Sequence, residues 1–395
     1  MDSPNISSQR FRVVIAGGGV AALEAALALR DLAGDLVTTT LIAPEEEFVY
    51  RPMTVREPFA YSAAMRYPIA EIARDAGAEL RADTLKSVDP ARRTVQTEAG
   101  EQLRYDALLL GLGARAQASY EPATTLDDRR LDEVLHGLVQ DVEGGYAQRV
   151  AFVIPGRAGW PLPIYELALF TARRAYDMNM NLAVTIATPE DAPLAIFGDA
   201  VSAAVAQLLE HNGITTITSA YCEVPDDFHV DIHPGNQRLE VDRIVALPEL
   251  FGPSLHDLPG APHGFIAVDA HCQVAGVERV YAAGDVTDFA VKHGGIAAQQ
   301  ADTATEAIAA LAGAPIEPRP FHPVLQGVLL GGDKPLYLTA EITGGRGSRS
   351  QVSDTPAWSP GTKIAARYLA PYLDKRDRAA DGSATLGSHP ENPDS

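Results

Sequence analysis

A strand, a glycine-rich turn, a helix and a second strand follow one another near the start of the chain, and this unit constrains the fold more than any other feature. Residues 11–16 (FRVVIA) have the composition of a buried strand, GGGVAA at 17–22 follows at once, and 21–32 (AALEAALALRDL) favours a helix. Residues 37–43 (VTTTLIA) read as the next strand. The order predicts a βαβ unit with parallel strands.

The glycines of this turn carry the spacing of a dinucleotide-binding fingerprint, Gly17-x-Gly19-x-x-Ala22. Gly17 permits the tight turn, Gly19 lets the backbone approach a pyrophosphate, and Ala22 allows the helix to pack on the strand. The free N–H groups at the helix start, from Val20 and Ala21 onward, would face the phosphates. Glycine-rich turns are also common without a ligand, so the strand–turn–helix context carries the prediction.

An acidic residue that holds the ribose hydroxyls is expected about 20 residues after the turn, at the tip of the second strand. That tip reads Ala43-Pro44-Glu45-Glu46-Glu47. We expect Glu45 to fill this role, with a solvated acidic turn as the alternative.

A second unit of the same type follows at 149–187. Residues 149–154 (RVAFVI) predict a strand, 164–175 a helix and 182–187 (LAVTIA) a further strand. The loop between the first strand and the helix, 155–163, has lost the glycine fingerprint. The chain is therefore expected to be an α/β protein with two tandem Rossmann-like folds.

The C-terminal part predicts a small α+β unit. Residues 321–343 suggest strands, 363–373 a short amphipathic helix, and 376–395 has the composition of a disordered tail. Five basic residues of the segment 363–378 led us to consider a helix lying on a membrane surface, with packing against the body of the protein or a second subunit as the alternative. They are Lys363, Arg367, Lys375, Arg376 and Arg378.

Composition excludes several functions. The formal net charge of −20 argues against nucleic acid as a partner, because binding phosphates needs a basic surface. Cys222 and Cys272 lie too far apart for a CxxC pair, and no metal site is expected. No apolar run reaches the length of a membrane span, and the start lacks a signal peptide, so we expect a cytoplasmic protein.

With these segments in order, the chain resembles the FAD-dependent pyridine nucleotide-disulfide oxidoreductase superfamily, over about residues 10–345. Three motifs carry the resemblance: GGGVAA at 17–22, YDALLLGLGAR at 105–115 and VYAAGDVTDF at 280–289. The resemblance implies a glutathione reductase-like fold and FAD, contacted by Gly111 and Gly113 of the second motif and by Gly284 and Asp285 of the third. It also implies the domains: 1–118 and 247–320 for FAD, 119–246 NAD(P)-binding-like, and 321–375 as a C-terminal interface domain.

Within this superfamily the chain is most similar to sulfide:quinone oxidoreductases, flavocytochrome sulfide dehydrogenases and type II NADH dehydrogenases. FVYRPM at 48–53 resembles the segment that these proteins place beside the isoalloxazine ring, which makes Tyr50, Arg51 and Pro52 candidates for the flavin pocket. The helix that begins near Gly295 and Ile296 would direct its N–H dipoles at the flavin pyrimidine. Two residues just before that helix are further candidates, Lys292 for cofactor binding and His293 for catalysis.

Two departures limit what the resemblance implies. The acidic neighbours of Cys222 should raise its pKa, and Cys272 is expected to be a packed thiol, so disulfide-reductase and two-cysteine sulfide chemistry are excluded. The loop 155–163 resembles the form that does not use NAD(P)H. In it, Trp160 could stack where nicotinamide would lie, or brace the turn as a core residue.

Two acidic residues of the second unit complete the candidates. Glu166 falls where related NADH dehydrogenases place a glutamate near the flavin and could relay a proton to a quinone, or could simply favour the helix start. Glu190 could hold an adenosine ribose if NADH binds.

The sequence leaves three functions open. The first is an FAD-dependent oxidoreductase that passes two electrons from an unidentified reductant to a quinone-like or other small acceptor. The second is an NAD(P)H dehydrogenase that uses the second fold, and the third is a flavin-bound binding or regulatory module. Peripheral contact with the inner face of a membrane and a homodimer stay open as well.

Overall fold

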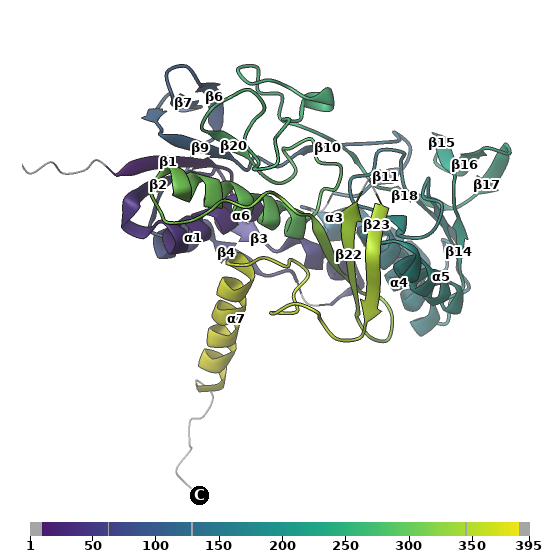
Figure 1. Cartoon of the computed structure of the whole chain (residues 1–395). Helices are drawn as coiled ribbons and strands as arrows, with labels where there is room; N and C mark the ends of the chain where they lie inside the picture. The colour runs from purple at the N-terminus through teal and green to yellow at the C-terminus, as the bar shows by residue number, and fades with distance from the viewer. Residues whose placement is uncertain (1–9, 62, 128, 344–345, 387–395) are drawn as a thin grey trace, which may run out of the picture.

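Two five-stranded parallel sheets form the frame of the molecule, each covered by helices (Figure 1). The computed structural model describes residues 10–61, 63–127, 129–343 and 346–386. This arrangement confirms the expected α/β class with two Rossmann-like folds.

The first sheet has the order β20-β9-β1-β2-β5, so a late segment of the chain completes the fold that the N-terminus begins. Its strands are β1 (Phe11–Ala16), β2 (Val37–Ile42), β5 (Ala78–Arg81), β9 (Ala107–Leu110) and β20 (Val280–Ala282). Helices α1 (Val20–Leu32), α2 (Ile69–Asp75) and α6 (Gly294–Leu311) share one apolar core with it. Smaller elements complete this part: η1 (Gly34–Leu36), β3 (Glu47–Val49), η2 (Arg51–Phe59), β4 (Arg66–Pro68), β6 (Leu85–Asp89), β7 (Thr94–Thr97) and β8 (Gln102–Arg104).

The second sheet has the order β11-β18-β12-β13-β14. Its strands are β11 (Thr124–Thr125), β12 (Arg149–Val153), β13 (Ala183–Ala187), β14 (Ile214–Ile217) and β18 (Arg243–Ala246), with helices α3 (Leu131–Glu143), α4 (Leu162–Asp177) and α5 (Asp199–His211) around it. An antiparallel meander, β15 (Tyr221–Asp226), β16 (His229–His233) and β17 (Gln237–Glu240), projects from one end, and η3 (Ala195–Phe197) precedes α5. The chain crosses between the two folds through β10 (Arg115–Gln117) and β19 (Glu249–Phe251), which pair with each other, and η4 (Pro262–Gly264) follows.

Three antiparallel strands, β21 (Val324–Leu329), β22 (Leu336–Thr343) and β23 (Arg346–Ser353), form the third unit. Leu325, Leu329 and Leu338 from this sheet enter the core of the second fold. The third unit therefore packs mainly on the second fold.

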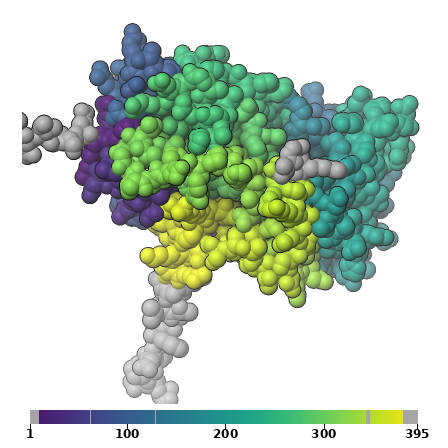
Figure 2. Space-filling view, viewed as in Figure 1, coloured from purple at the N-terminus to yellow at the C-terminus, as the bar shows by residue number. Residues whose placement is uncertain are grey.

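The C-terminal segment departs from the prediction in two ways. Residues 361–368, which we call the C-terminal strap, are not helical, and helix α7 begins only at Leu369 and runs to Leu386. Residues 369–373 are helical as predicted, but 363–368 are not. The disorder predicted from 376 is wrong up to Leu386, because α7 continues to that residue, and 387–395 lie outside the described residues. In the space-filling view the yellow C-terminal residues form a band across one face (Figure 2).

Four of the five basic residues of this segment form ion pairs. Lys363 pairs with Glu166, Arg367 with Glu306, Arg376 with Glu71 and Arg378 with Asp374. The first three pairs join the segment to the body of the protein, whereas that of Arg378 lies within α7. Contact of this helix with a membrane surface stays a prediction. Among the helices of the described ranges, none is long and apolar enough to cross a bilayer.

Candidate functional site

The three glycine motifs meet at the carboxyl ends of β1, β9 and β20. Gly17 has φ +129°, and a Cβ added there would collide with the carbonyl of Gly111. A Cβ on Gly284 would lie 3.3 Å from that of Ala21 and 3.1 Å from that of Ala297. Helices α1 and α6 therefore approach each other at a point where only glycine fits.

The turn before α1 is open where a ligand phosphate would approach. No atom lies within 4 Å of the position that a Cβ on Gly19 would take, and the same holds at Gly113. Gly19 is the N-cap of α1 and makes no side-chain capping bond, so the N–H groups that follow, including those of Val20, Ala21 and Ala22, keep the positive end of the helix directed into this space.

Glu45 lies beside the same turn. Its carboxylate oxygen Oε2 is 3.0 Å from the position of a Cβ on Gly18, and its side chain is exposed. The acid therefore stands free at the tip of β2, within reach of a ligand held by the glycine turn.

The N-terminal end of α6 brings two predicted catalytic residues together. The ring centroids of His293 and Trp160 lie 4.3 Å apart with the ring planes tilted by 37°, and the ring of Trp160 also contacts that of Phe197 at 5.7 Å between centroids. His293 is the N-cap of α6 without a side-chain capping bond, and its buried Nδ1 has no hydrogen-bond partner. Burial lowers the pKa of His293 to about 4, and the positive charge of Lys363 adds to this, so its imidazole is neutral at pH 7.

Lys292 is held by the segment that follows β20. Its ammonium Nζ donates to the carbonyl oxygens of Asp285 and Thr287, at 3.2 and 2.5 Å, and lies 3.9 Å from the centroid of the Phe265 ring. Burial lowers its pKa to about 8. Its backbone N–H donates to the carbonyl of Gly159, so the loop before α4 lies directly on the segment that leads into α6.

Glu166 is not a free carboxylate. It is 1% exposed, and Lys363 from the C-terminal strap donates to both its oxygens, at 2.6 and 2.7 Å. Leu330 N–H donates to the same carboxylate, and Lys363 also donates to the carbonyl of Pro52 at 3.0 Å. Burial raises the pKa of Glu166 and lowers that of Lys363. Both folds, the third unit and the strap thus meet at one buried ion pair.

The segment 50–52 lies against the C-terminal strap. Tyr50 Oη accepts a hydrogen bond from Ile364 N–H at 2.8 Å, and Ile364 in turn covers Gly294 at the start of α6. Arg51 is exposed at the first position of η2. Next along α6 are Gly295 and Ile296, both buried.

The start of α4 offers fewer free N–H groups than the start of α1. Helix α4 begins after Pro161, and Pro163 is its second residue, so neither offers an N–H, while Ile164 N–H already donates to the carbonyl of Pro161. Tyr165 Oη donates to Glu190 at 2.7 Å, as does Thr188 Oγ1 at 3.1 Å. Glu190 is therefore bonded within the protein, and burial raises its pKa to about 7.

The two cysteines do not pair. Cys222 lies on β15 of the second fold, and Cys272 is buried in the core of the first. Burial raises the pKa of Cys222 to about 11 and that of Cys272 to about 12. The pKa of Cys222 is thus raised as expected, but the cause is burial and not its acidic neighbours.

Three residues of this region escaped sequence reasoning: Lys363, Glu24 and Asp302. No sequence pattern indicated that Lys363 pairs with Glu166, because the two residues lie 197 positions apart. Glu24 and Asp302 are carboxylates within helices otherwise rich in Ala and Leu. A charged residue on an apolar helix face is a signal that could have been used.

Comparison with known proteins decides the family. The model of the pyridine nucleotide-disulphide oxidoreductases matches residues 11–309. The chain belongs to this family. The match spans both parallel sheets and the start of α6, which are the parts that assemble the site.

Relatives within the family are distant. The chain is 25% identical over 337 residues to the "Alternative NAD(P)H-ubiquinone oxidoreductase C1, chloroplastic/mitochondrial" of Arabidopsis thaliana, and this covers 73% of the chain but 64% of the plant protein. It is 23% identical over 300 residues to ferroptosis suppressor protein 1 of Taeniopygia guttata, covering 70% and 74% of the two chains. The structure of the sulfide:quinone oxidoreductase from Aquifex aeolicus superposes with a TM-score of 0.76 at 18% identity, over 94% of this chain and 90% of that one.

Proposed function

We propose that the protein is an FAD-dependent oxidoreductase that passes two electrons from a reductant other than NAD(P)H to a quinone-like acceptor. When bound, FAD supplies the two-electron chemistry. Family membership and the names of the relatives, which include ubiquinone and quinone as acceptors, support this reading.

The residues at the ends of β1, β2 and β20 fit such a cofactor. The N–H groups at the start of α1, in the open space beside Gly19, would bind the pyrophosphate, and Glu45 would accept hydrogen bonds from the ribose. Asp285 would bind the ribityl-phosphate part, with Lys292 beside it. The start of α6 would place its positive end at the pyrimidine of the ring.

Beside that end of α6, the chain provides groups for handling protons. His293 is neutral with an unpartnered Nδ1. Lys363, which pairs with Glu166, precedes Ile364, and the side chain of Ile364 lies against Gly294 directly after His293. The ring of Trp160 packs against that of His293 at this helix end. We assign Glu166 and Lys363 the role of holding a proton for the acceptor.

A recess lined by aromatic and charged side chains lies close to this pair. Its charged residues are Arg173, Arg174, Asp177 and Asp333, and its aromatic rings would contact an aromatic acceptor. Two adjoining cavities of about 180 and 200 Å³ share Tyr61 and Phe170 in their walls. Phe170 is one turn beyond Glu166 on α4, about 6 Å along the helix axis. Gly331 in the wall follows Leu330, whose N–H donates to Glu166. The recess is therefore our candidate for the approach of the acceptor.

The structure at the start of α4 is the reason that we propose a reductant other than NAD(P)H. A nicotinamide dinucleotide needs N–H donors at this helix end and a free acid at the tip of the next strand. Pro161 and Pro163 remove donors, and Glu190 is bonded to Tyr165. The alternative, an NAD(P)H dehydrogenase, is favoured by the name of the plant relative.

Anaerobic reduction tests the proposal. The purified protein is expected to carry FAD, and NADH or NADPH should bleach its absorbance near 450 nm no faster than they bleach free FAD. Dithionite, as a chemical reductant, should reduce the flavin, and a soluble quinone added afterwards should reoxidise it. Rapid bleaching by NADH would favour the dehydrogenase instead, and a protein that takes up no FAD would refute the proposal.

A further inference from the structure

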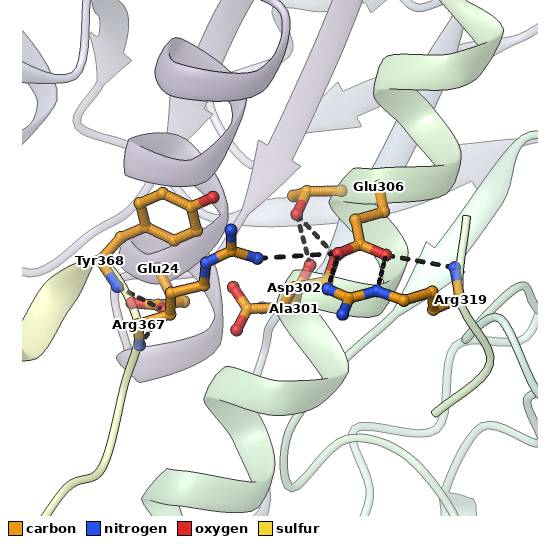
Figure 3. A network of polar contacts seen from close by, with 8 residues as sticks. Glu24, Ala301, Asp302, Glu306, Arg319, Arg367 and Tyr368 are labelled. Atoms are coloured by element: carbon orange, nitrogen blue, oxygen red, sulfur yellow. Dashed lines mark hydrogen bonds and ion pairs between the residues drawn. The ribbon is translucent and has the colours of Figure 1, made fainter. Parts of the chain in front are cut away.

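Three carboxyl side chains from two helices meet the C-terminal strap where it leads into α7. Glu24 comes from α1, and Asp302 and Glu306 come from α6 (Figure 3). The strap contributes Arg367 and Tyr368. The proposed redox chemistry does not use this cluster.

Glu24 fastens the strap through its backbone. Its carboxylate accepts hydrogen bonds from the N–H groups of Arg367, Tyr368 and Leu369, at 2.7, 2.8 and 2.5 Å. These groups belong to the start of α7, whose first N–H groups have no partner within the helix. A side chain that is 0% exposed thus caps a helix more than 340 positions away in the sequence.

Asp302 lies beside this capping carboxylate and has no cation of its own in hydrogen-bond contact. Its Oδ1 is buried and makes no hydrogen bond. Burial raises the pKa of Asp302 to about 8, and the nearby charge of Glu24 adds to this, while Arg367 acts in the opposite direction. Two like carboxylates cannot both stay ionised at low cost when buried together, so one proton is retained by the pair.

Glu306 differs from this pair although it lies one turn further along α6. Arg319 donates to both its oxygens and Arg367 lies 3.7 Å away. Burial acts to raise its pKa, but the hydrogen bonds from Arg319 outweigh this and lower it. The remaining titratable group of the strap here is Tyr368, whose pKa burial raises, with Asp31 of α1 adding to the rise.

The fastened strap covers the start of α6. Ile364 lies 3.1 Å from the position of a Cβ on Gly294, and the carbonyl of Ala365 lies 3.4 Å from that on Gly295. The same stretch delivers Lys363 to Glu166. Whatever holds the strap therefore controls access to this helix end.

We propose that Glu24 and Asp302 form a proton-dependent latch: their shared proton holds the strap closed over the start of α6, and its loss loosens the strap. The inference rests on the proposed function only in that this helix end borders the proposed active site. It adds a form of regulation to that site.

The direction of the effect follows from linkage. The closed strap retains a proton on a carboxyl whose ordinary pKa is about 4, so closure is strongest at low pH. Closure weakens as pH rises toward about 8, the pKa of Asp302, and changes no further above it. For one proton, the ratio of closed to open strap falls about tenfold per pH unit within that window.

Hydrogen exchange measures the closure directly. Protection factors of the amides of Arg367, Tyr368 and Leu369, corrected for the intrinsic exchange rate at each pH, should fall about tenfold per pH unit between about pH 5 and 7.5 in the native sequence. Asp302→Asn keeps a donor beside Glu24 and removes the titration, so its protection should be independent of pH. Glu306→Gln is the matched control on the same helix and should keep the slope.

Equal slopes in the native protein and in Asp302→Asn, or no slope in the native protein, would overturn the latch. If Asp302→Asn does not retain protection at pH 6, Asp302→Ser replaces it, because a hydroxyl also offers a donor beside Glu24 without a titrating carboxyl, and the same loss of slope is expected. The hydrogen-exchange measurement does not require bound flavin. A protein without FAD would refute the proposed function while leaving this measurement valid.

Discussion

At the residue scale, the glycines of the first turn serve two different purposes. Gly17 is required by the backbone, because it has φ +129° and faces the Gly111 carbonyl. Gly19 has an ordinary φ of −90° and no neighbour within 4 Å. One position therefore serves the fold and the other leaves room for a ligand.

This difference predicts contrasting effects of the same substitution. Gly17→Ala should destabilise the first fold, because a methyl group would collide with rigid backbone at a φ that L-residues avoid. Gly19→Ala should change the free energy of unfolding of the apoprotein by no more than a surface substitution does, about 0.5 kcal/mol. It should weaken FAD binding. Flavin content and the thermal midpoint, measured on both variants, test this. Full FAD occupancy in Gly19→Ala would contradict the prediction that the pyrophosphate binds beside Gly19.

The buried pair of Lys363 and Glu166 predicts a second effect at this scale. Lys363→Met should cost about 3–5 kcal/mol, because it leaves the Glu166 carboxylate buried without its cation. The double variant with Glu166→Gln should recover much of this loss, since the uncompensated charge is gone. Urea unfolding midpoints of both variants provide the measurement. A double variant as unstable as the single one would contradict a dominant role for the charge.

At the scale of elements, local patterns in the sequence predicted the frame well. The strand–turn–helix–strand order of 11–43 and that of 149–187 both formed, because each helix and strand is specified by its own residues. The C-terminal strap was mispredicted as a helix for a physical reason. Its apolar residue Ile364 and its basic residue Lys363 are satisfied by burial against distant segments, and no local pattern reports this.

The same limit applies to the site. Placement of Glu45 beside the glycine turn follows from the βαβ unit, so it could be predicted. The pairing of Glu166 with Lys363 depends on how the second fold packs against the strap, and no spacing in the sequence encodes it. Likewise, Tyr165 reaches Glu190 only after α4 and β13 have packed.

Glu190 gives the second fold a measurable pH dependence. Burial raises its pKa to about 7, above the ordinary value of about 4.5, so the folded state holds a proton that the unfolded chain releases. Stability should therefore fall as pH rises from about 4.5 to 7, by at most about 1.4 kcal/mol per pH unit from this group. Comparison of unfolding free energies with Glu190→Gln over this range isolates the effect. Parallel pH profiles would show that Glu190 is ionised in the folded protein.

At the scale of the whole molecule, the C-terminal segment joins parts that are otherwise separate. Lys363 reaches the second fold, Ile364 bonds to Tyr50, and residues 367–369 bond to Glu24 of the first fold. The segment thus contributes to both folds at once.

Truncation should reveal this joint role. A chain that ends at Pro360 leaves Glu166 and Glu24 buried without their partners, so it should lose more stability than either Lys363→Met or Glu24→Gln alone. A chain that ends at Leu386 keeps these contacts and serves as the control. Thermal midpoints and expression of soluble protein compare the two. Equal midpoints would mean that the strap contributes little to folding.

The prolines at the start of α4 also bear on how such a protein changes over evolution. Under the function that we propose, a gain of nicotinamide binding would need replacement of Pro161 and Pro163 and release of Glu190 from Tyr165. A substitution at one of these positions leaves the other two obstacles in place. Such a gain is therefore expected to need several changes together.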